Sequence, residues 1–207
     1  MRVRVPSPLT SRDPRGAGLL ARAGLALVAL AALGCPSQPG PSASPSPAAS
    51  STPDSRRAEA KAAAQALGRA LKARLSEAIQ AGGVPEGISA CKLAAPEITA
   101  NEGRGSGLKI GRTSFKLRNP ANSPPDWALS DVAGRVESPT FSTAPDGTLQ
   151  ALLPIRLEGL CLSCHGPEAD LTPEVRAALA RDYPEDRATG FAAGDLRGWF
   201  WIEVPSK

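Results

Sequence analysis

Hydrophobic side chains recur at helical spacing within residues 54–80. Four of them follow one another at intervals of four positions, at Leu67, Leu71, Leu75 and Ile79. This spacing places them on one face of a helix, where packing in a core is the simplest role for them. Asp54 or Ser55 can cap the helix, which is expected to extend through Gln80 and to end at Gly82-Gly83.

A second, short helix is expected to begin near Pro85-Glu86, because proline is favoured in the first turn of a helix. Cys91 lies on its apolar side, together with Ile88, Ala94 and Ala95. Pro96 is expected to end or kink this helix, since proline lacks a backbone donor and clashes with the preceding turn.

Alternation of hydrophobic and polar residues then predicts strands. Residues 108–112 alternate, and Phe115 and Leu117 continue the pattern. A second strand is expected over 149–157. Residues 198–204 are rich in aromatic and β-branched side chains and are expected to form a closing strand.

Turn residues and caps place two further helices among these strands. The segment 122–126 is predicted to be a turn that leads to a short helix over 127–132. Thr172 can cap a helix over 173–181. Helices first, then antiparallel strands interrupted by helices, indicate a single α+β domain over residues 54–207.

The N-terminal region has the composition of an export signal. Residues 23–34 are apolar and uncharged, follow a basic segment and end at Cys35. Because a helix of this length is too short for a bilayer core of about 30 Å, the segment is predicted to belong to a signal peptide. Small residues before a cysteine resemble a bacterial lipobox, in which the cysteine is lipidated; ordinary cleavage nearby is the alternative.

Three regions are therefore expected. Residues 1–34 form a lipoprotein signal peptide, and residues 35–53 comprise the lipidated Cys35 and a tether rich in proline and serine. Residues 54–207 form the folded domain. The mature protein is expected on the periplasmic side of a bacterial membrane, attached to it through the lipid alone.

The charge balance argues against nucleic acid as a partner. The formal net charge is +4, but residues 1–34 contain five basic residues and one acidic residue. The rest of the chain has 19 residues of each sign, so the folded part lacks the net basic charge expected of a nucleic-acid-binding domain. Aromatic residues make up only 4% of the chain, so the core must rest mainly on aliphatic side chains.

The segment 161–165 has the C-x-x-C-H pattern of c-type haem attachment. Two thiols at this spacing, Cys161 and Cys164, can reach the two vinyl groups along one porphyrin edge, and His165 can then bind the iron. Covalent attachment takes place on the outer side of the bacterial membrane, which agrees with the export signal. One covalent haem c is therefore the expected cofactor.

Three other interpretations of these residues remain open. Cys161 and Cys164 could form a redox dithiol, although Gly166-Pro167 follows where a thioredoxin-type motif would open a helix. They could also form a structural disulfide. Together with the histidine and Cys91 they make a Cys₃His set suited to structural zinc.

The composition narrows the choice of a second axial ligand for a haem iron. His165 is the only histidine, and Met1 is the only methionine and leaves with the signal peptide. A cysteine thiolate, a lysine amine, water or an open position remain. Cys91 is the cysteine left over, and Lys92 beside it could favour the thiolate. The alternative role for Cys91 is that of a small buried hydrophobe.

Four segments together resemble a known family. They are GISACKLAAPEI (87–98), KIGRTSFKLRNPANSPPDW (109–127), CLSCHG (161–166) and YPEDRATGFAAGDLRGWFW (183–201). In this order, over about residues 58–204, they resemble a family first defined as a domain of unknown function. Its members are single-haem c-type cytochromes with a PAS-like fold and His/Cys axial ligation, found also as haem sensor domains of signalling proteins.

The resemblance implies a PAS-like antiparallel sheet with N-terminal helices, and a role for individual residues. The haem would be held by Cys161 and Cys164, with His165 as the proximal iron ligand and Cys91 as the distal one. Arg112 and Arg118 would be candidates for pairing with the haem propionates, because guanidinium groups suit carboxylates. Plain surface charge is the alternative for these two arginines.

Other residues of the matching segments are expected to be structural. Asn119 and Asn122 are expected to order a turn, and Trp127 is expected to pack in the core rather than on a haem. Tyr183-Pro184 is expected to shape the return into the last strand.

Three functions are compatible with these features. The first is a redox- or gas-responsive haem module: Cys91 would leave the iron on reduction, nitric oxide or carbon monoxide would bind, and a signalling partner would sense the change. The second is a lipid-tethered carrier of single electrons for a redox partner protein. The third, of another class, is a structural Cys₃His zinc-binding lipoprotein.

An enzyme is the least favoured class, and no catalytic residue is predicted. The one histidine is committed to the iron, so no Ser/His/Asp set can be assembled. A haem with two protein ligands also leaves no open position for a substrate.

Overall fold

The computed structural model of the 207-residue chain describes residues 52–206. The predicted signal peptide, the lipidation site Cys35 and nearly all of the tether lie outside the described residues. Within the range that is described, no helix combines the length and the apolar character needed to cross a membrane.

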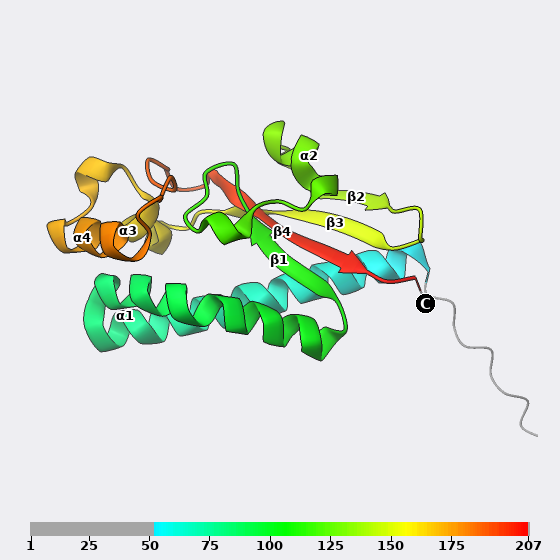
Figure 1. Cartoon of the computed structure of the whole chain (residues 1–207), viewed down its shortest axis with the longest axis horizontal. Helices are drawn as coiled ribbons and strands as arrows, with labels where there is room; N and C mark the ends of the chain where they lie inside the picture. The colour runs from blue at the N-terminus through cyan, green and yellow to red at the C-terminus, as the bar shows by residue number, and fades with distance from the viewer. Residues whose placement is uncertain (1–51, 207) are drawn as a thin grey trace, which may run out of the picture. The chain divides into compact units, whose positions relative to one another are not determined.

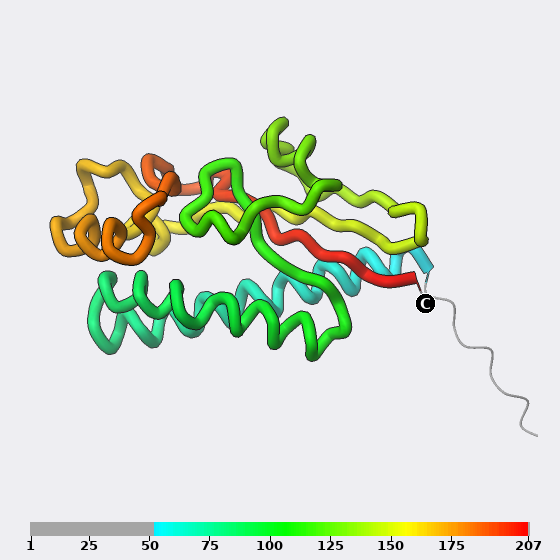
Figure 2. The backbone as a smooth tube through the Cα atoms, in the orientation of Figure 1, coloured from blue at the N-terminus to red at the C-terminus, as the bar shows by residue number. Residues whose placement is uncertain are grey.

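Helix α1, Pro53–Ser106, consists of two arms joined at a sharp bend (Figure 1). Thr52 caps its start by accepting a hydrogen bond from the Ser55 amide, slightly earlier than the sequence predicted. Gly82 and Gly83 have non-helical backbone angles, and the φ of Gly83 is +76°, a conformation that favours glycine. The predicted stop at this pair is confirmed, and the second arm folds back beside the first (Figure 2).

The second arm is longer than predicted, because it continues through Pro96 to the end of α1. The backbone at Pro96 stays helical, so the prediction that the helix could end there is wrong. Ala95 is buried and Ile98 packs against the main core, and these contacts outweigh the missing backbone donor. Gly107, with a φ of 71°, ends the helix.

Four antiparallel strands form one sheet in the order β1-β4-β3-β2. Their bounds are Lys109–Thr113 for β1, Thr140–Thr143 for β2, Leu149–Arg156 for β3 and Leu196–Val204 for β4. The three predicted strands are confirmed as β1, β3 and β4. The sequence missed β2, because this short edge strand shows no alternation of buried and exposed residues.

The first strand ends at Thr113, whereas Phe115 and Leu117 were expected to continue it. The chain turns away from the sheet here, since the Ser114 hydroxyl accepts a hydrogen bond from the amide two residues later, at 3.0 Å. Phe115 packs edge-on against Trp199 instead, with ring centroids 6.1 Å apart.

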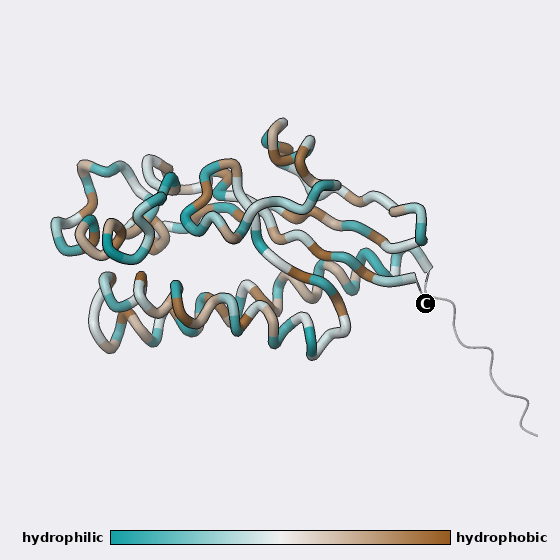
Figure 3. The backbone as a smooth tube through the Cα atoms, viewed as in Figure 1, coloured by the Kyte–Doolittle hydropathy of each residue, from teal (hydrophilic) through white to brown (hydrophobic). Residues whose placement is uncertain are grey.

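Helix α1 covers one face of the sheet (Figure 1). The core between them is almost entirely aliphatic: Ala60, Ala64, Leu67, Leu108, Ile110, Leu149, Ala151, Leu153, Ile202 and Val204. Figure 3 shows hydrophobic positions recurring along α1 and the central strands. Of the predicted helical stripe, Leu67 and Leu71 pack in this core as expected.

The opposite face of the sheet carries a second, aromatic core. The short helices η2 (Asp126–Ala128) and α2 (Leu129–Ala133) lie here, where a turn and a helix were predicted. Trp199 is fully buried at this face. Trp127 packs beside it and donates from its indole nitrogen to the Glu203 carboxylate at 2.9 Å, so its predicted place in the core is confirmed.

Helices α3 (Leu162–His165) and α4 (Pro173–Asp182) lie at one end of the sheet (Figure 1). Thr172 caps α4 as predicted, by accepting a hydrogen bond from the Val175 amide. A small core ties α4 to the second arm of α1, formed by Ile88, Leu171, Val175, Ala178, Leu179 and Tyr183. Three further single turns of 3₁₀-helix are η1 (Pro120–Asn122), η3 (Gly159–Cys161) and η4 (Glu168–Asp170).

The predicted α+β class is confirmed. The fold is a long N-terminal helix, bent into a hairpin, on a four-stranded antiparallel sheet. The short helices η3 and α3, which follow β3, contain the C-x-x-C-H segment and place it at the end of the sheet, opposite the second arm of α1.

Candidate functional site

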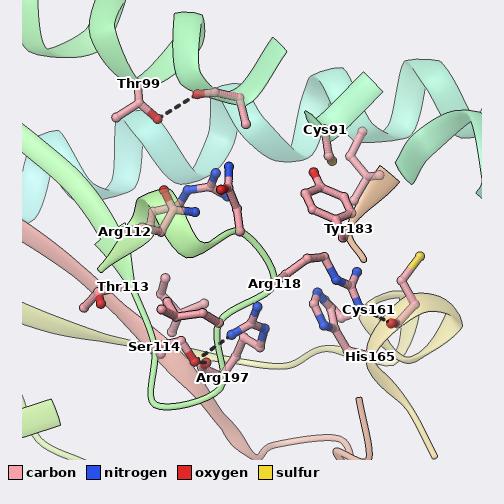
Figure 4. Close-up of a pocket in the computed structure, with 18 of the residues that line it drawn as sticks. Cys91, Thr99, Arg112, Thr113, Ser114, Arg118, Cys161, His165, Tyr183 and Arg197 are labelled. Atoms are coloured by element: carbon pink, nitrogen blue, oxygen red, sulfur yellow. Dashed lines mark hydrogen bonds between the residues drawn. The ribbon is translucent and has the colours of Figure 1, made fainter. Parts of the chain in front are cut away.

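A cavity of about 480 Å³ opens between the second arm of α1, the loop after β1 and the C-x-x-C-H segment (Figure 4). Its volume lies in the range of roughly 300–1,000 Å³ typical of pockets for organic ligands and cofactors. Its walls are mainly apolar. Leu75 and Ile79, which the sequence pattern assigned to the core, line this cavity instead.

All the residues predicted to hold a cofactor line this one cavity. They are Cys91, Arg112, Arg118, Cys161, Cys164 and His165. They come from α1, from β1 and the loop that follows it, and from the η3–α3 segment. The fold therefore assembles them from three separate parts of the chain.

The C-x-x-C-H segment forms a tight helical turn. Cys161 ends η3, and Cys164 and His165 follow in α3, so the three side chains are spaced i, i+3 and i+4. This spacing directs them to the same side of the turn. Neither cysteine is paired in a disulfide, and neither is Cys91.

The imidazole of His165 is held in one orientation. Its Nδ1–H donates to the backbone carbonyl of Ala188 at 2.7 Å, which leaves Nε2 with a free lone pair. Burial, followed by the positive charges of Arg118 and Arg197, lowers the pKa of His165 well below its usual value. The ring is therefore neutral, which is the form that binds a metal.

Cys91 enters the cavity from the second arm of α1, on the side opposite His165 (Figure 4). Burial raises the pKa of the Cys91 thiol, and the positive charges of Arg112 and Arg118 partly oppose this effect. Lys92 was expected to favour the thiolate. Its ammonium instead lies 3.8 Å from the Asp182 carboxylate, and it is not among the charges that lower the Cys91 pKa.

Tyr183 is a cavity residue that the sequence assigned only to a turn. It is 9% exposed, lines the cavity, and directs its hydroxyl toward Cys91 (Figure 4). Burial, followed by the negative charge of Cys91, raises the pKa of Tyr183 to about 12. The phenol therefore stays protonated, and it is a hydrogen-bond donor placed beside the thiol.

Three guanidinium groups, from Arg112, Arg118 and Arg197, face the cavity (Figure 4). Arg118 forms an ion pair with Asp186 at 3.1 Å, whereas Arg112 has no hydrogen-bond or ion-pair partner among residues 52–206. No aspartate or glutamate in the described part of the chain lines the cavity. The cavity therefore has an excess of positive charge that suits a ligand with two negative charges.

Arg197 is a second cavity residue that the sequence did not identify. It comes from the start of β4 and donates to the Ser114 hydroxyl at 2.7 Å and to the Lys116 carbonyl at 3.0 Å. Its Nε is buried without a partner, as is the hydroxyl of Thr113 nearby in the lining. Burial, followed by the charge of Arg118, lowers the pKa of Arg197 to about 10.

The loop after β1 is ordered as predicted. The Asn119 side chain accepts a hydrogen bond from the Ala121 amide at 3.0 Å and so caps η1. Asn119 and Asn122 also line the cavity, which the sequence did not foresee.

The arrangement does not suit a single small metal ion. In the described part of the chain, no three histidine, cysteine, aspartate or glutamate side chains come close enough to hold one. The cysteines and the histidine surround a cavity instead of meeting at a point, which argues against the Cys₃His zinc interpretation.

Comparisons with known proteins find a family model and a solved structure that match the chain. The family model described as Tll0287-like matches residues 50–205. The crystal structure of the cyanobacterial heme-protein Tll0287 matches with a TM-score of 0.54 and 22% sequence identity, covering 75% of this chain and 98% of that chain. At this identity the match shows the fold. No curated protein matches the chain.

Proposed function

This chain belongs to the Tll0287-like family, and we propose that its folded domain binds one covalent c-type haem. The observation that supports the proposal best is that one cavity is lined by both cysteines and the histidine of the C-x-x-C-H segment. A structure of the same fold, Tll0287, is described as a heme-protein. We also propose two further traits that the family resemblance implies, namely a PAS-like sheet and axial ligation of the haem iron by His165 and Cys91.

The residues present fit a haem. Cys161 and Cys164 would carry the two thioether bonds, His165 would bind the iron through its free Nε2, and Cys91 would face the iron from α1. A bound haem supplies a one-electron redox centre. The protein orients His165, surrounds the cavity with mainly apolar walls and presents a thiol opposite the imidazole.

The propionates are assigned to Arg112 and Arg197. Arg112 has no other partner within residues 52–206, and the Nε of Arg197 is buried and unsatisfied. Two carboxylates would neutralise these two cations through charge-assisted hydrogen bonds. Arg118, which the sequence proposed for this role, already donates to Asp186.

A redox- or gas-responsive role fits Cys91 best. Because burial raises the pKa of its thiol, Cys91 stays a thiolate only while positive charge lies opposite it. A haem bound there would supply a one-electron redox centre, and Cys91, whose protonated thiol is favoured by burial, would be the residue that responds to its charge. Nitric oxide or carbon monoxide would be the ligand that this response admits, and a signalling protein would sense the change.

We further propose that the protein is exported and held at the periplasmic side of a membrane by a lipid on Cys35. This part of the proposal rests on the sequence before the domain. We propose no enzymatic activity, because the only histidine is assigned to the iron.

The decisive experiment is an optical spectrum of the exported full-length protein, oxidised and reduced by dithionite, beside that of Cys91→Ala. The expected result is haem that survives denaturation, a ferric spectrum altered by Cys91→Ala, and a new ferrous spectrum when nitric oxide is added after reduction. Thr99→Val, which replaces only the hydroxyl of another cavity-lining side chain on the same helical arm, is the matched control and should leave the spectra unchanged.

Each failure has its own meaning. A colourless protein would refute haem binding. Haem that is indifferent to Cys91→Ala would remove Cys91 from the iron. A spectrum unchanged by nitric oxide would refute gas sensing and would leave the redox-responsive module and the single-electron carrier as the remaining roles.

A further inference from the structure

A loop, residues 186–191, holds the ring of His165. The Nδ1–H of His165 donates to the Ala188 carbonyl at 2.7 Å. The Phe191 amide donates back to the His165 carbonyl at 3.0 Å. Because α3 is only four residues long, the position of this loop decides how the imidazole is oriented.

A poorly exposed ion pair fixes the loop. Nε of Arg118 donates to Asp186 at 3.1 Å, and the two side chains are 13% and 9% exposed. The second carboxylate oxygen of Asp186 accepts a hydrogen bond from the Ala188 amide at 2.8 Å. Nη2 of Arg118 donates to the carbonyl of Ala188 at 3.3 Å and also to that of Cys164.

The contacts of this pair converge on one residue, Ala188. Asp186 holds the amide of Ala188, and Arg118 holds its carbonyl, which is the same oxygen that accepts from His165. Arg118 also links this carbonyl to Cys164, one residue before the histidine. The pair therefore joins the loop to the C-x-x-C-H segment.

Stability alone is a poor explanation for such a pair. A buried ion pair is often no more stabilising than apolar side chains of the same size, because both charges lose their hydration. The hydrogen bond that a ligating histidine donates from its second nitrogen does, however, set the ring orientation and its strength as a donor.

We propose that Arg118 and Asp186 are a positioning pair that sets the orientation and donor strength of His165 toward the haem iron. This inference rests on the proposed function. It gives Arg118 a role different from that of Arg112 and Arg197, although all three line the same cavity.

The test uses the exported full-length protein with both charges replaced together, as Arg118→Met with Asp186→Leu. Net charge is unchanged, and no buried charge is left without a partner. The control is Arg156→Met with Glu137→Leu, which removes an ion pair of 2.9 Å whose side chains are 47% and 68% exposed. The measurements are the midpoint potential, the ferric EPR spectrum and amide hydrogen exchange.

In the first double variant the Nδ1–H bond should weaken, so the imidazole becomes a poorer donor and stabilises ferric iron less. The expected results are a higher midpoint potential, more than one ferric EPR species, and exchange at least about tenfold faster at Ala188 and Phe191. The control should match the wild type. If the first double variant does not accumulate, Arg118→Lys takes its place. Lysine keeps the positive charge but lacks the planar guanidinium that donates from both Nε and Nη2. This variant should change all three measurements in the same direction.

An unchanged potential and EPR spectrum in a haem-bearing variant would overturn the inference and leave the proposed function intact. A wild-type chain without covalent haem would overturn the proposed function, and the role toward iron with it. Hydrogen exchange tests separately whether the pair positions the loop. Unchanged exchange at Phe191, whose acceptor is the His165 carbonyl and is removed by neither substitution, would show that it does not.

Discussion

The guanidinium of Arg112 and the thiol of Cys91 line the same cavity, and each shifts the pKa of the other. Burial raises the pKa of Cys91, and the charge of Arg112 opposes the rise. Burial lowers the pKa of Arg112, and the charge of Cys91 opposes the fall. Neither side chain has a hydrogen-bond partner within residues 52–206. The haem-free protein thus keeps an unpaired cation and a partly buried thiol together, an arrangement typical of a binding site rather than of a core.

Arg112→Met should therefore raise the stability of the haem-free protein and lower the midpoint potential of the haem-bearing protein. In the haem-free variant Cys161→Ala/Cys164→Ala, removing an unpaired, partly buried cation should raise the free energy of unfolding by about 1 kcal/mol. In the haem-bearing protein it should lower the midpoint potential, since a positive charge near the iron disfavours the ferric state. Urea unfolding and spectroelectrochemistry measure the two effects.

Arg156→Met is the matched control for this prediction, because its guanidinium is half exposed and lies in an ion pair with Glu137. It should change both quantities little. A loss of stability in the haem-free Arg112→Met protein would show that Arg112 supports the fold and is not reserved for a ligand.

The sequence predicted most of the elements because their signals are local. The stop at Gly82-Gly83, the cap at Thr172 and the aromatic strand after Arg197 each depend on a few neighbouring residues. The C-x-x-C-H segment is equally local, so its residues were identified before any fold was known. Pro96 was misjudged because contacts from distant parts of the chain hold its helix together.

The unpredicted part of the site depends on distances across the fold. Arg197 reaches the cavity because β4 pairs with both β1 and β3, which no local pattern reveals. Tyr183 reaches it because α4 packs on the second arm of α1. Arg118 lines the cavity, but its partner Asp186 lies 68 positions away, and only the fold shows the ion pair between them.

Gly198→Ala should destabilise the protein by roughly 2–4 kcal/mol. The φ of Gly198 is +157°, and a Cβ there would lie 2.2 Å from the Thr113 carbonyl, so β1 and β4 would have to separate. The control is Gly105→Ala, because a Cβ at Gly105 meets nothing within 4 Å. In a helix this change should stabilise by about 0.5–1 kcal/mol. Thermal or urea unfolding compares the two, and equal stabilities would contradict the prediction.

Tyr183→Phe should change the spectrum of the ferric protein without changing its stability. The hydroxyl has no hydrogen-bond partner within residues 52–206, so its loss should cost less than about 0.5 kcal/mol. Because the pKa of Tyr183 is raised to about 12, the phenol keeps its proton at neutral pH and can donate a hydrogen bond. Removing it should strengthen donation from Cys91 and shift the ferric absorption bands. Identical spectra of Tyr183→Phe and the wild type would exclude a contact between the hydroxyl and the bound thiolate.

Acidification should destabilise the haem-free protein through His165. Burial, followed by the charges of Arg118 and Arg197, lowers the pKa of His165 well below 6.5 in the folded state. In the unfolded chain the histidine titrates near its ordinary value of about 6.5. Below that pH the unfolded state binds more protons, so stability falls as the pH drops, by up to about 1.4 kcal/mol per pH unit for this one group. The fall ends once the pH passes below the folded pKa.

Urea unfolding of Cys161→Ala/Cys164→Ala at pH 7.5 and pH 5.5 measures this loss. Adding His165→Gln should remove the part of the pH dependence that belongs to the imidazole, because glutamine does not titrate. Carboxylates contribute equally to both proteins, so the difference between the two pH profiles isolates His165. Equal pH dependence with and without the histidine would mean that the ring is accessible to protons in the folded state. Its hydrogen bond to Ala188 would then not suffice to keep it neutral, and neither would its burial.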